Sequence, residues 1–284
     1  MKFVHDWHMH TRHSMCGKHR GTMSAVFNQA MDAGIRELGI TDHLNHEYCV
    51  PLIKASRAEY DATPKPDGLI THFAVEVPVL RKFDDICFQK HGWDSKTFSI
   101  QATTAEENEY MFYLTPEFKE EMGFEYVIGG AHMILGTPLV REEMIKCYHR
   151  QNMFCARHPL IDIVVHPWWW NGPWAEEDKN YRTLPWFDDF NVIPKSMHQE
   201  FARACIENKK AVEINAQAMF VNHRYSDSFK KQYIEYLQFM KEQGVTFSFG
   251  SDSHFDGYSG NLCKIEDIVE SLKIAPDKIW YLKK

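Results

Sequence analysis

Several features that would identify a particular class of protein are missing from this 284-residue sequence. It has no run of about 18 apolar residues, the length that a membrane-spanning helix requires, so we expect no membrane span. The opening segment, MKFVHDWHMH, lacks the apolar stretch of a secretory signal peptide. Internal repeats, low-complexity segments and Gly/Ser linkers are also missing. We therefore expect a single domain over residues 1–284, with no membrane partner.

Paired cysteines and an excess of positive charge are missing as well. The seven cysteines are scattered, odd in number and without a CxxC pair, a pattern typical of reduced thiols in a cytoplasmic protein. The formal net charge of −7 argues against nucleic acid as the main partner, because binding to its backbone requires a basic face. It does not exclude an anionic substrate, since bound divalent ions reverse the local field. The oligomeric state is left open.

What the sequence does contain is an alternation of short apolar runs with helical patterns, and its 44 % apolar residues can form a sizeable core. Strands are expected at Phe3–Trp7, Glu37–Thr41, Ile70–Val77, Tyr126–Gly130, Ile161–Val165, Ala211–Ile214 and Thr246–Gly250. Helices are expected at Thr22–Ala33, Thr104–Met122, Arg141–Arg157, Ser196–Asn208 and Asp227–Gln243. This alternation predicts an α/β fold of parallel strands with right-handed crossovers, and its seven units favour a closed or nearly closed barrel. Trp168–Asn191 has no clear periodicity and is expected to be a long loop over the barrel mouth.

Histidine is abundant, with 16 residues, and the segment VHDWHMHTRHSMCGKH places five histidines within fifteen residues. They are interleaved with apolar and turn residues, which excludes a purification tag. Two explanations remain for this cluster. It is either a chance enrichment, or one part of a metal site whose other ligands lie further along the chain.

Imidazoles and carboxylates also occur at the ends of most of the predicted strands. In chain order they are His8 and His10, Asp42 and His43, Glu76, His132, His166, Glu213 with Asn215, and Asp252 with His254. Parallel strands of a barrel gather their carboxyl ends on one face, where the active sites of such barrels lie. We therefore expect these side chains at one mouth, with Asp42 either ligating a metal or orienting His43.

The spacing within these pairs has a structural consequence. Alternate residues of a strand point the same way, so His8 and His10 project together, as do Asp252 and His254. Nitrogen and carboxylate ligands suit Zn, Fe or Mn. Each motif alone has a structural alternative, since a histidine after a strand is commonly a hydrogen-bonded core residue and SDSH can cap a helix. Their recurrence in six of the seven predicted strands favours a site for two or three metal ions.

The motifs HMH, GITDH, a glutamate in the third strand, GGAH, VVHP and GSDSH occur in this order over most of the chain. As a set they resemble the polymerase and histidinol phosphatase (PHP) family of metal-dependent phosphoesterases. The resemblance implies a distorted (β/α)₇ TIM-like barrel of the PHP type. It also implies two or three divalent ions, Zn, Mn or Fe, in the mouth of the barrel.

The resemblance further implies a distribution of ligands. The first ion would take His8, His10, Glu76 and Asp252, the second Glu76, His132 and His166, and the third His43, His254 and His19. The family often places the last of these ligands six residues beyond the second histidine of HxH, and here that position is Cys16. Because CGKH resembles the family's CGH with one extra residue, His19 is the expected ligand, with Cys16 and His13 as alternatives.

The implied activity is that of a metal-dependent phosphomonoester hydrolase. A hydroxide bridging two ions would attack phosphorus in line, while the ions offset the charge on the phosphate oxygens. Asp252 is expected to orient the hydroxide or take its proton. Either His254 or His19 is expected near the leaving oxygen, unless the third ion acts there without a protein acid. Arg12 is expected either to clamp the phosphate or to be a solvated loop charge. Asn215 is expected near the substrate, and Glu213 to support a ligand from outside.

The length of the chain and its lack of a polymerase module resemble the stand-alone histidinol phosphatase branch. L-histidinol phosphate, an intermediate of histidine biosynthesis, is therefore the expected small phosphorylated substrate. Trp168–Trp170, Trp174 and Trp186 would either form a stacking wall around it or pin the long loop to the barrel. The alternatives are an amidohydrolase-like C–N hydrolase, a PHP-type nuclease and a non-catalytic metal sensor. The acidic balance and the lack of a basic, aromatic-rich stretch count against the nuclease.

Overall fold

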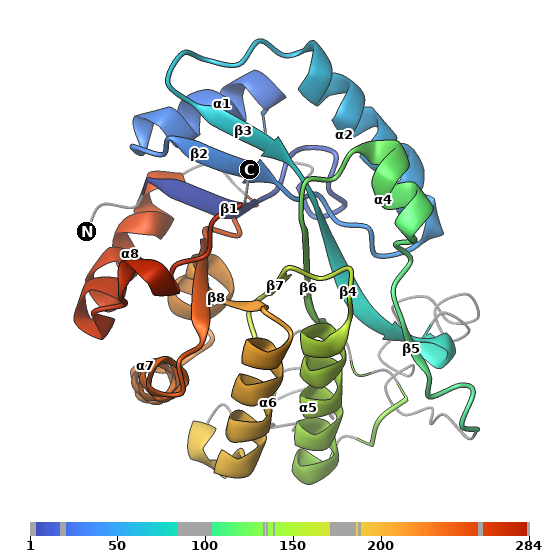
Figure 1. Cartoon of the computed structure of the whole chain (residues 1–284), viewed down its shortest axis with the longest axis vertical. Coiled ribbons are helices and arrows are strands. Elements are labelled where there is room, and N and C mark those ends of the chain that lie inside the picture. Colours follow the sequence, from blue (N-terminus) through green and yellow to red (C-terminus); the bar gives the residue numbers. More distant parts are fainter. Residues whose placement is uncertain are drawn as a thin grey trace, which may run out of the picture.

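The computed structural model shows a mixed α/β fold built around parallel strands (Figure 1). It describes residues 4–17, 21–84, 104–132, 134, 136–138, 140–170, 186, 189–254 and 258–282. No helix within these ranges combines the length and the apolar character needed to cross a membrane. The strands are β1 (His5–Met9), β2 (Glu37–Ile40), β3 (Ile70–Phe73), β4 (Val75–Arg81), β5 (Tyr110–Met111), β6 (Val127–Ala131), β7 (Ile163–Val164), β8 (Ala211–Asn215) and β9 (Thr246–Gly250).

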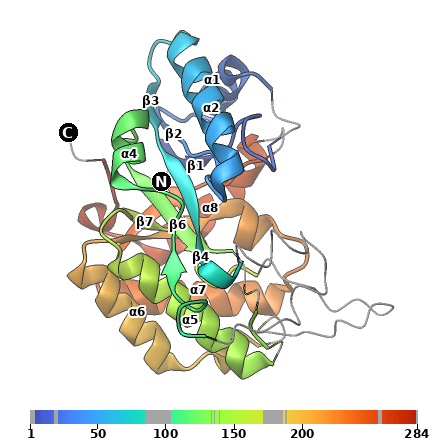
Figure 2. The ribbon, with the colours of Figure 1, turned by 90° about the vertical axis from the view of Figure 1, so that its right-hand side faces the viewer.

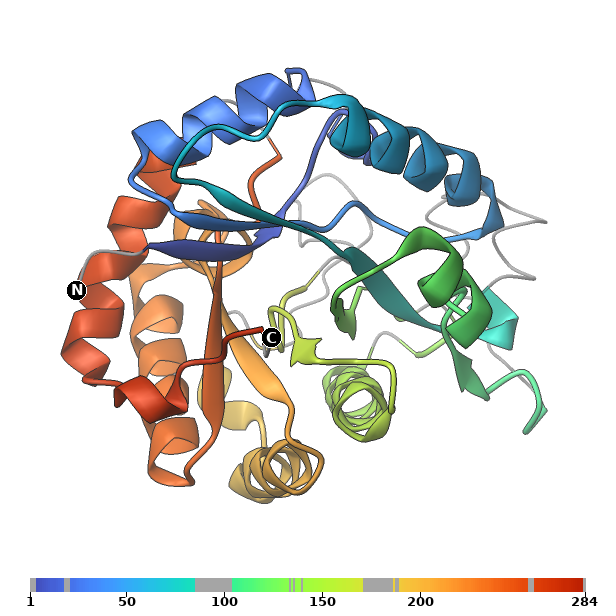
Figure 3. The same cartoon turned by 45° about the horizontal axis from the view of Figure 1, so that its top comes forward.

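The α-helices lie between these strands in the chain, except for α8, which follows β9, and they lie on the outer side of the strands in space (Figure 3). They are α1 (Met23–Asp32), α2 (Val50–Ala62), α4 (Pro116–Met122), α5 (Arg141–Arg157), α6 (Lys195–Glu207), α7 (Asp227–Glu242) and α8 (Tyr258–Leu272). Shorter helical turns are Glu47–Cys49, Phe190–Val192 and Pro276–Lys278, and Ala216–Val221 is a π-helix. Figures 1 and 2 agree that α1 and α2 lie at one end of the molecule and α5 and α6 at the other.

The strands form two hydrogen-bonded groups in the order β1-β2-β3 and β5-β4-β6-β7-β8-β9. All pairings are parallel except the one between β4 and the two-residue β5. Only Ala74 separates β3 from β4, so the predicted third strand is confirmed but is divided between the two groups. At the other side, the Asp252 amide donates to the His8 carbonyl at 2.8 Å, which places the end of β9 beside β1.

Local signals explain where most elements begin. The side chains of Thr22, Thr115 and Ser226 accept hydrogen bonds from backbone amides at the starts of α1, α4 and α7. The expected helix over Thr104–Met122 is wrong in its first half. Pro116 follows the Thr115 cap and starts α4 there, because proline fits the first turn of a helix. The residues before it contain turns and β5 instead.

The two ends of the strands have different surroundings. A small core at the amino ends contains Trp7, Tyr126 and Ile163, and Trp280 near the carboxyl end of the chain packs against it. Close by, His72 lies 2.7 Å from Glu125 and 3.0 Å from Glu37. The carboxyl ends carry most of the polar side chains that were predicted to bind metal. The apolar core around Trp7 therefore lies at the end of the strands opposite to the candidate site.

Candidate metal centre

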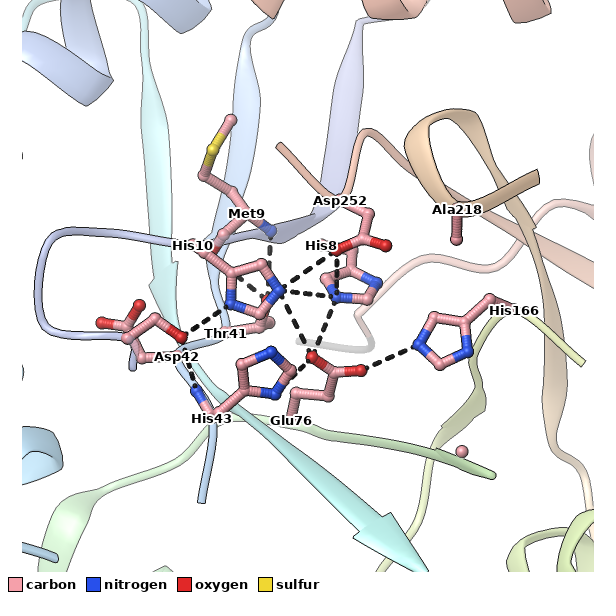
Figure 4. Close-up of polar contacts among 12 residues, drawn as sticks. His8, Met9, His10, Thr41, Asp42, His43, Glu76, His166, Ala218 and Asp252 are labelled. Carbon is pink, nitrogen blue, oxygen red and sulfur yellow. Dashed lines mark hydrogen bonds and ion pairs between the residues drawn. The ribbon is translucent and has the colours of Figure 1, made fainter. Parts of the chain in front are cut away.

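Eight of the nine predicted ligands, all except His19, lie at the carboxyl ends of the strands, and Figure 4 shows five of them, His8, His10, His43, His166 and Asp252, around the side chain of Glu76. They come from β1 and the residue after it (His8, His10), from the segment after β2 (His43), from β4 (Glu76), and from the segments after β6, β7 and β9 (His132, His166, Asp252, His254). Apart from His254, which is partly exposed, all of them are buried. The convergence joins residues that are up to 246 positions apart, counted from His8 to His254.

One oxygen of Glu76 faces three imidazoles. Its Oε2 atom lies 2.9 Å from Nδ1 of His43, 3.2 Å from Nε2 of His8 and 3.3 Å from Nε2 of His10. The other oxygen faces two more, with Oε1 lying 3.0 Å from Nε2 of His166 and 3.1 Å from Nε2 of His132. Glu76 itself is completely buried. A carboxylate in that position requires positive charge around it, and its two oxygens are arranged to share that charge between two groups of imidazoles.

Four of these side chains have the spacing of ligands around a single ion. The ligand atoms of His8, His10, Glu76 and Asp252 lie 3.1, 3.2, 3.3, 3.3 and 3.4 Å apart in five of their pairings. Ligands about 2.0–2.1 Å from a tetrahedral ion lie about 3.3 Å from one another. Two unprotonated Nε2 atoms only 3.1 Å apart repel each other unless a proton or a cation lies between them. These residues therefore fit a metal ion.

The imidazoles are held so that their second nitrogen faces the centre. Nδ1 of His8 lies 2.7 Å from Oε1 of Glu213, and Nδ1 of His132 lies 3.1 Å from the Gly130 carbonyl. Nδ1 of His254 lies 2.8 Å from the Asp252 carbonyl. A carboxylate or carbonyl at this position fixes the tautomer of the ring and aims the other nitrogen, as is usual for histidine ligands of metals.

Two nitrogens at the centre lack a hydrogen bond of their own. Nδ1 of His43 and Nε2 of His132 are buried and, among the described residues, have no partner in hydrogen-bond geometry, although each lies near an oxygen of Glu76. Buried polar atoms without partners are rare, and an ion that accepts their lone pairs would satisfy both. This observation supports the same assignment as the ligand spacing does.

The charges of the centre shift its pKa values strongly. Burial alone would raise the pKa of Glu76, but the imidazoles of His43, His8 and His132 outweigh it and hold this pKa well below its usual range. Burial lowers the pKa of His43 to about 4 and that of His254 to about 3. At neutral pH both rings are therefore uncharged, which is the protonation state that binds a metal.

The backbone conformation of Asp252 and the side-chain amide of Asn215 orient the Asp252 carboxylate. Asp252 and His166 adopt positive φ angles of 52° and 29°, which are uncommon for residues other than glycine and are often found at functional sites. The side-chain amide of Asn215 donates to Oδ2 of Asp252 at 3.1 Å and to Oε2 of Glu213 at 2.9 Å. Oδ1 of Asp252 is left facing His8 and His10.

The loop after β1 carries the remaining predicted residues, and the structure separates them. Arg12 donates two hydrogen bonds to Glu59 of α2, at 3.1 and 3.0 Å, and Nε2 of His13 lies 2.5 Å from the same carboxylate. Neither side chain faces Glu76 in this arrangement. His19 lies outside the described residues. Donor atoms of Cys16, His10, His43 and His254 lie within 4.8 Å of one another.

In the structure Asp42 takes neither of the two roles expected from the sequence, which were to ligate a metal or to orient His43. Its carboxylate accepts hydrogen bonds from the backbone amide and the hydroxyl of Thr11, both at 2.7 Å, and from the Ser56 hydroxyl at 2.6 Å. It therefore anchors the loop after β1 rather than the ring of His43. Ser14 was not predicted from the sequence, although its hydroxyl lies 3.2 Å from Nδ1 of His10. A serine in this loop gives no sequence signal that distinguishes it from a turn residue.

The described tryptophans of this segment have two kinds of surroundings. Trp168, Trp170 and Trp186 are buried and pack around Tyr148 of α5, so they pin this part of the chain to the fold. Trp169 is partly exposed, and its ring centroid lies 4.8 Å from that of His166 and 5.5 Å from that of His132. Residues 171–185, with Trp174 and most of the expected mouth loop, lie outside the described residues.

Of the comparisons with known proteins, the one with solved structures supports the fold. No protein-family model matches the sequence, and a comparison with curated proteins finds no match either. Among solved structures, the histidinol phosphate phosphatase from Lactococcus lactis subsp. lactis, complexed with zinc, L-histidinol and phosphate, superposes with a TM-score of 0.57 at 15 % identity, covering 96 % of this chain and 94 % of that one. The structure named as the putative histidinol phosphatase from Listeria monocytogenes superposes with a TM-score of 0.52 at 13 % identity, covering 90 % of this chain and 99 % of that one. These two neighbours share the fold of this chain, and both bear the name of the phosphatase branch that the motifs resemble.

Proposed function

We propose that this chain is a cytoplasmic, metal-dependent phosphomonoester hydrolase, with L-histidinol phosphate as its substrate. The observation that carries the proposal is the position of Glu76, buried between two groups of imidazoles at the carboxyl ends of parallel strands. The neighbour that was solved with zinc, L-histidinol and phosphate has the same fold over nearly its whole length, which supports the choice of substrate.

The donor set supports two ions that share Glu76. His8, His10 and Asp252 would complete the first, and His132 and His166 the second. His43 and His254 would contribute to a third. Divalent ions held in this way lower the pKa of water toward neutrality and offset negative charge on phosphoryl oxygens.

Asp252 is the residue we assign to the attacking water. Its Oδ1 atom faces the centre, while Asn215 holds Oδ2 from the other side. A carboxylate oriented in this way can accept the proton that the water gives up as it attacks phosphorus. Glu213 holds the side chains of Asn215 and His8 in place, since one of its oxygens contacts Asn215 and the other contacts His8.

We also propose that the strands close into the distorted (β/α)₇ barrel that the motifs imply, as a single domain. With β3 and β4 taken as one strand, seven parallel strands surround the centre. Hydrogen bonds from the Asp252 amide to the His8 carbonyl and from the His10 amide to the Ser253 carbonyl, at 2.8 and 3.4 Å, support closure between the first and last strands.

The test is phosphate release by the purified protein loaded in turn with Zn²⁺, Mn²⁺ and Fe²⁺. We expect turnover of L-histidinol phosphate with a kcat/KM well above that for p-nitrophenyl phosphate. Glu76→Gln should remove turnover and reduce bound metal, because the amide supplies one neutral oxygen where the carboxylate supplies two charged ones. Glu125→Gln, which alters another glutamate beside a histidine but at the opposite end of the strands, is the matched control and should retain both.

Two results would contradict the proposal. The first is hydrolysis of amides, or of DNA from its 3′ end, without phosphomonoester turnover, since this would identify a C–N hydrolase or a nuclease. The second is full metal binding without turnover of any of these substrates, which would indicate a metal-sensing protein.

A further inference from the structure

We propose that the third ion is held by a sulfur ligand, Cys16, together with His43 and His254. This inference rests on the metal-dependent hydrolase proposed above. The donor atoms of these three residues and of His10 lie within 4.8 Å of one another. His10 already faces Glu76 and Asp252 at 3.3 Å each, which leaves the other three side chains for a separate ion.

The loop after β1 is folded to bring the sulfur back toward the histidines. Asp42 fixes Thr11 at its start, and the Ser14 amide then donates to the Thr11 carbonyl at 3.1 Å. The Gly17 amide donates in turn to the Ser14 carbonyl at 2.9 Å. A Cβ atom on residue 17 would lie only 2.0 Å from the Thr11 carbonyl oxygen, so this double turn requires glycine at its end. Cys16 lies within the second turn, and although the residue is exposed, its Sγ atom lies within 4.8 Å of the donor atoms of His10, His43 and His254.

Ser14 connects the sulfur to two of the histidines. Its hydroxyl lies 3.5 Å from Sγ of Cys16 and 3.2 Å from Nδ1 of His10, and it accepts a hydrogen bond from the His43 amide at 3.3 Å. His43 is more than nine-tenths buried, and its Nδ1 has no partner in hydrogen-bond geometry among the described residues. This Nδ1 atom lies 2.9 Å from Oε2 of Glu76, and a donor atom of the same ring lies within 4.8 Å of Sγ of Cys16.

The alternative ligand His13 is occupied elsewhere, since its Nε2 atom lies 2.5 Å from Glu59. Three protein ligands would leave a fourth position of a tetrahedral ion for the substrate. An ion at this position needs N···S separations of about 3.6 Å, given Zn–S and Zn–N distances of about 2.3 and 2.0 Å. The separations in the structure do not exceed 4.8 Å.

A thiolate changes which metal the site accepts. Soft sulfur ligands favour Zn²⁺ and Co²⁺ over Mn²⁺, whereas sites made only of imidazole and carboxylate discriminate less. We therefore expect the third ion, and not the first two, to be lost when Mn²⁺ replaces Zn²⁺. The same site should be lost on treatment with hydrogen peroxide, since an exposed thiol that is oxidised no longer binds the metal in the same way.

The test is a titration of the metal-free protein with Co²⁺, followed by its ultraviolet absorption and by metal analysis. A bond between sulfur and Co²⁺ produces an intense charge-transfer band that nitrogen and oxygen ligands do not. We expect the band in the unaltered protein, and its complete loss in Cys16→Ser together with one equivalent of bound metal. Cys16→His should restore the ion without the band, which separates loss of a ligand from misfolding.

Two control variants complete the design. Cys147→Ser should retain the band, because this buried sulfur only accepts hydrogen bonds from Thr137 and Gln151, which a serine can replace. His19→Asn should also retain it. If the unaltered protein binds all its Co²⁺ without the band, or if His19→Asn loses an ion that Cys16→Ser keeps, the assignment of Cys16 is overturned.

The experiment distinguishes failure of the proposed sulfur ligand from failure of the proposed activity. A sulfur band without phosphatase turnover would support the ligand and contradict the function. Turnover with a full complement of ions but no band would support the function and overturn the ligand.

Discussion

Glu213→Gln gives the sharpest test of how the centre is supported, because the side chain contacts a predicted ligand without belonging to the ligand set. Oε1 of Glu213 accepts from Nδ1 of His8 at 2.7 Å, and Oε2 accepts from the His166 amide at 2.8 Å and from Asn215 at 2.9 Å. Glutamine has the same shape but only one acceptor oxygen, so either orientation of its amide places an NH₂ group against at least one of these donors.

The expected loss of metal affinity follows from the more favourable of the two orientations of the glutamine amide. It keeps the two bonds of Oε2 and loses the one to His8, which leaves one buried donor unpaired at a cost of about 1–3 kcal/mol. Residues that support metal ligands in this way typically contribute 10- to 100-fold in affinity, or about 1.4–2.8 kcal/mol. The two routes agree, so we expect the Kd for Zn²⁺ to rise by about 10- to 100-fold.

The pH dependence of this effect adds a second check. Burial lowers the pKa of His8, but the charges of Glu213, Glu76 and Asp252 outweigh it and raise this pKa well above its usual value. In the unaltered protein a proton therefore competes with the metal for His8 at neutral pH. Removing the charge of Glu213 lowers the affinity of His8 for this proton as well as for the metal. The loss of affinity should be larger at pH 9 than at pH 7, where proton competition partly masks it.

The assay is a competitive titration of Zn²⁺ against a chelator, with Glu200→Gln as the matched control. Glu200 also contacts an imidazole, that of His149 at 2.9 Å, but does so on α6 away from the centre. A change of less than twofold in Glu213→Gln, or an equal loss in Glu200→Gln, would refute the reasoning.

Three further predictions concern the surroundings of the centre. The glutamates beside His72 outweigh its burial and raise its pKa. The stability of the unaltered protein relative to His72→Asn, measured by denaturant titrations, should therefore be greatest below about pH 6.5 and decline as the pH rises through that raised pKa. In Gly250→Ala the new Cβ would lie 2.0 Å from Oε1 of Glu213, so unfolding in urea should show a loss of about 1–3 kcal/mol and metal analysis a loss of bound zinc. Trp169→Ala should raise KM for L-histidinol phosphate about 2- to 10-fold at unchanged zinc content; a loss of zinc instead would show that the ring only supports the ligands.

Much of the fold follows from local patterns, because each pattern reports the face that a short segment buries. The bounds expected for Arg141–Arg157 and Thr246–Gly250 are those of α5 and β9. Helix α2 was not predicted, since one of its three buried side chains is Ser56, which weakens the apolar periodicity. Helix α8 was also not predicted, although Leu262, Ile265, Val269 and Leu272 have helical spacing.

The candidate ligands were likewise identified from residue type and position. A histidine or carboxylate at the end of a strand predicts a shared face whatever the detailed packing, because parallel strands end on the same side. What each residue does at that face depends on its neighbours across the fold. Arg12 lies in sequence where a phosphate clamp would lie, but Glu59, 47 residues away, pairs with it.

The sequence by itself determined the alternation of strands and helices, the HxH and DxH pairs, and most of the side chains that meet at the carboxyl ends of the strands. All of these are set by chemistry within a few residues. Only the tertiary structure decided that both oxygens of Glu76 are shared, that Glu213 supports His8, and that Cys16 rather than His13 turns toward the histidines. These outcomes depend on distances of 3–5 Å between distant segments, which packing of the whole chain fixes and no local pattern encodes.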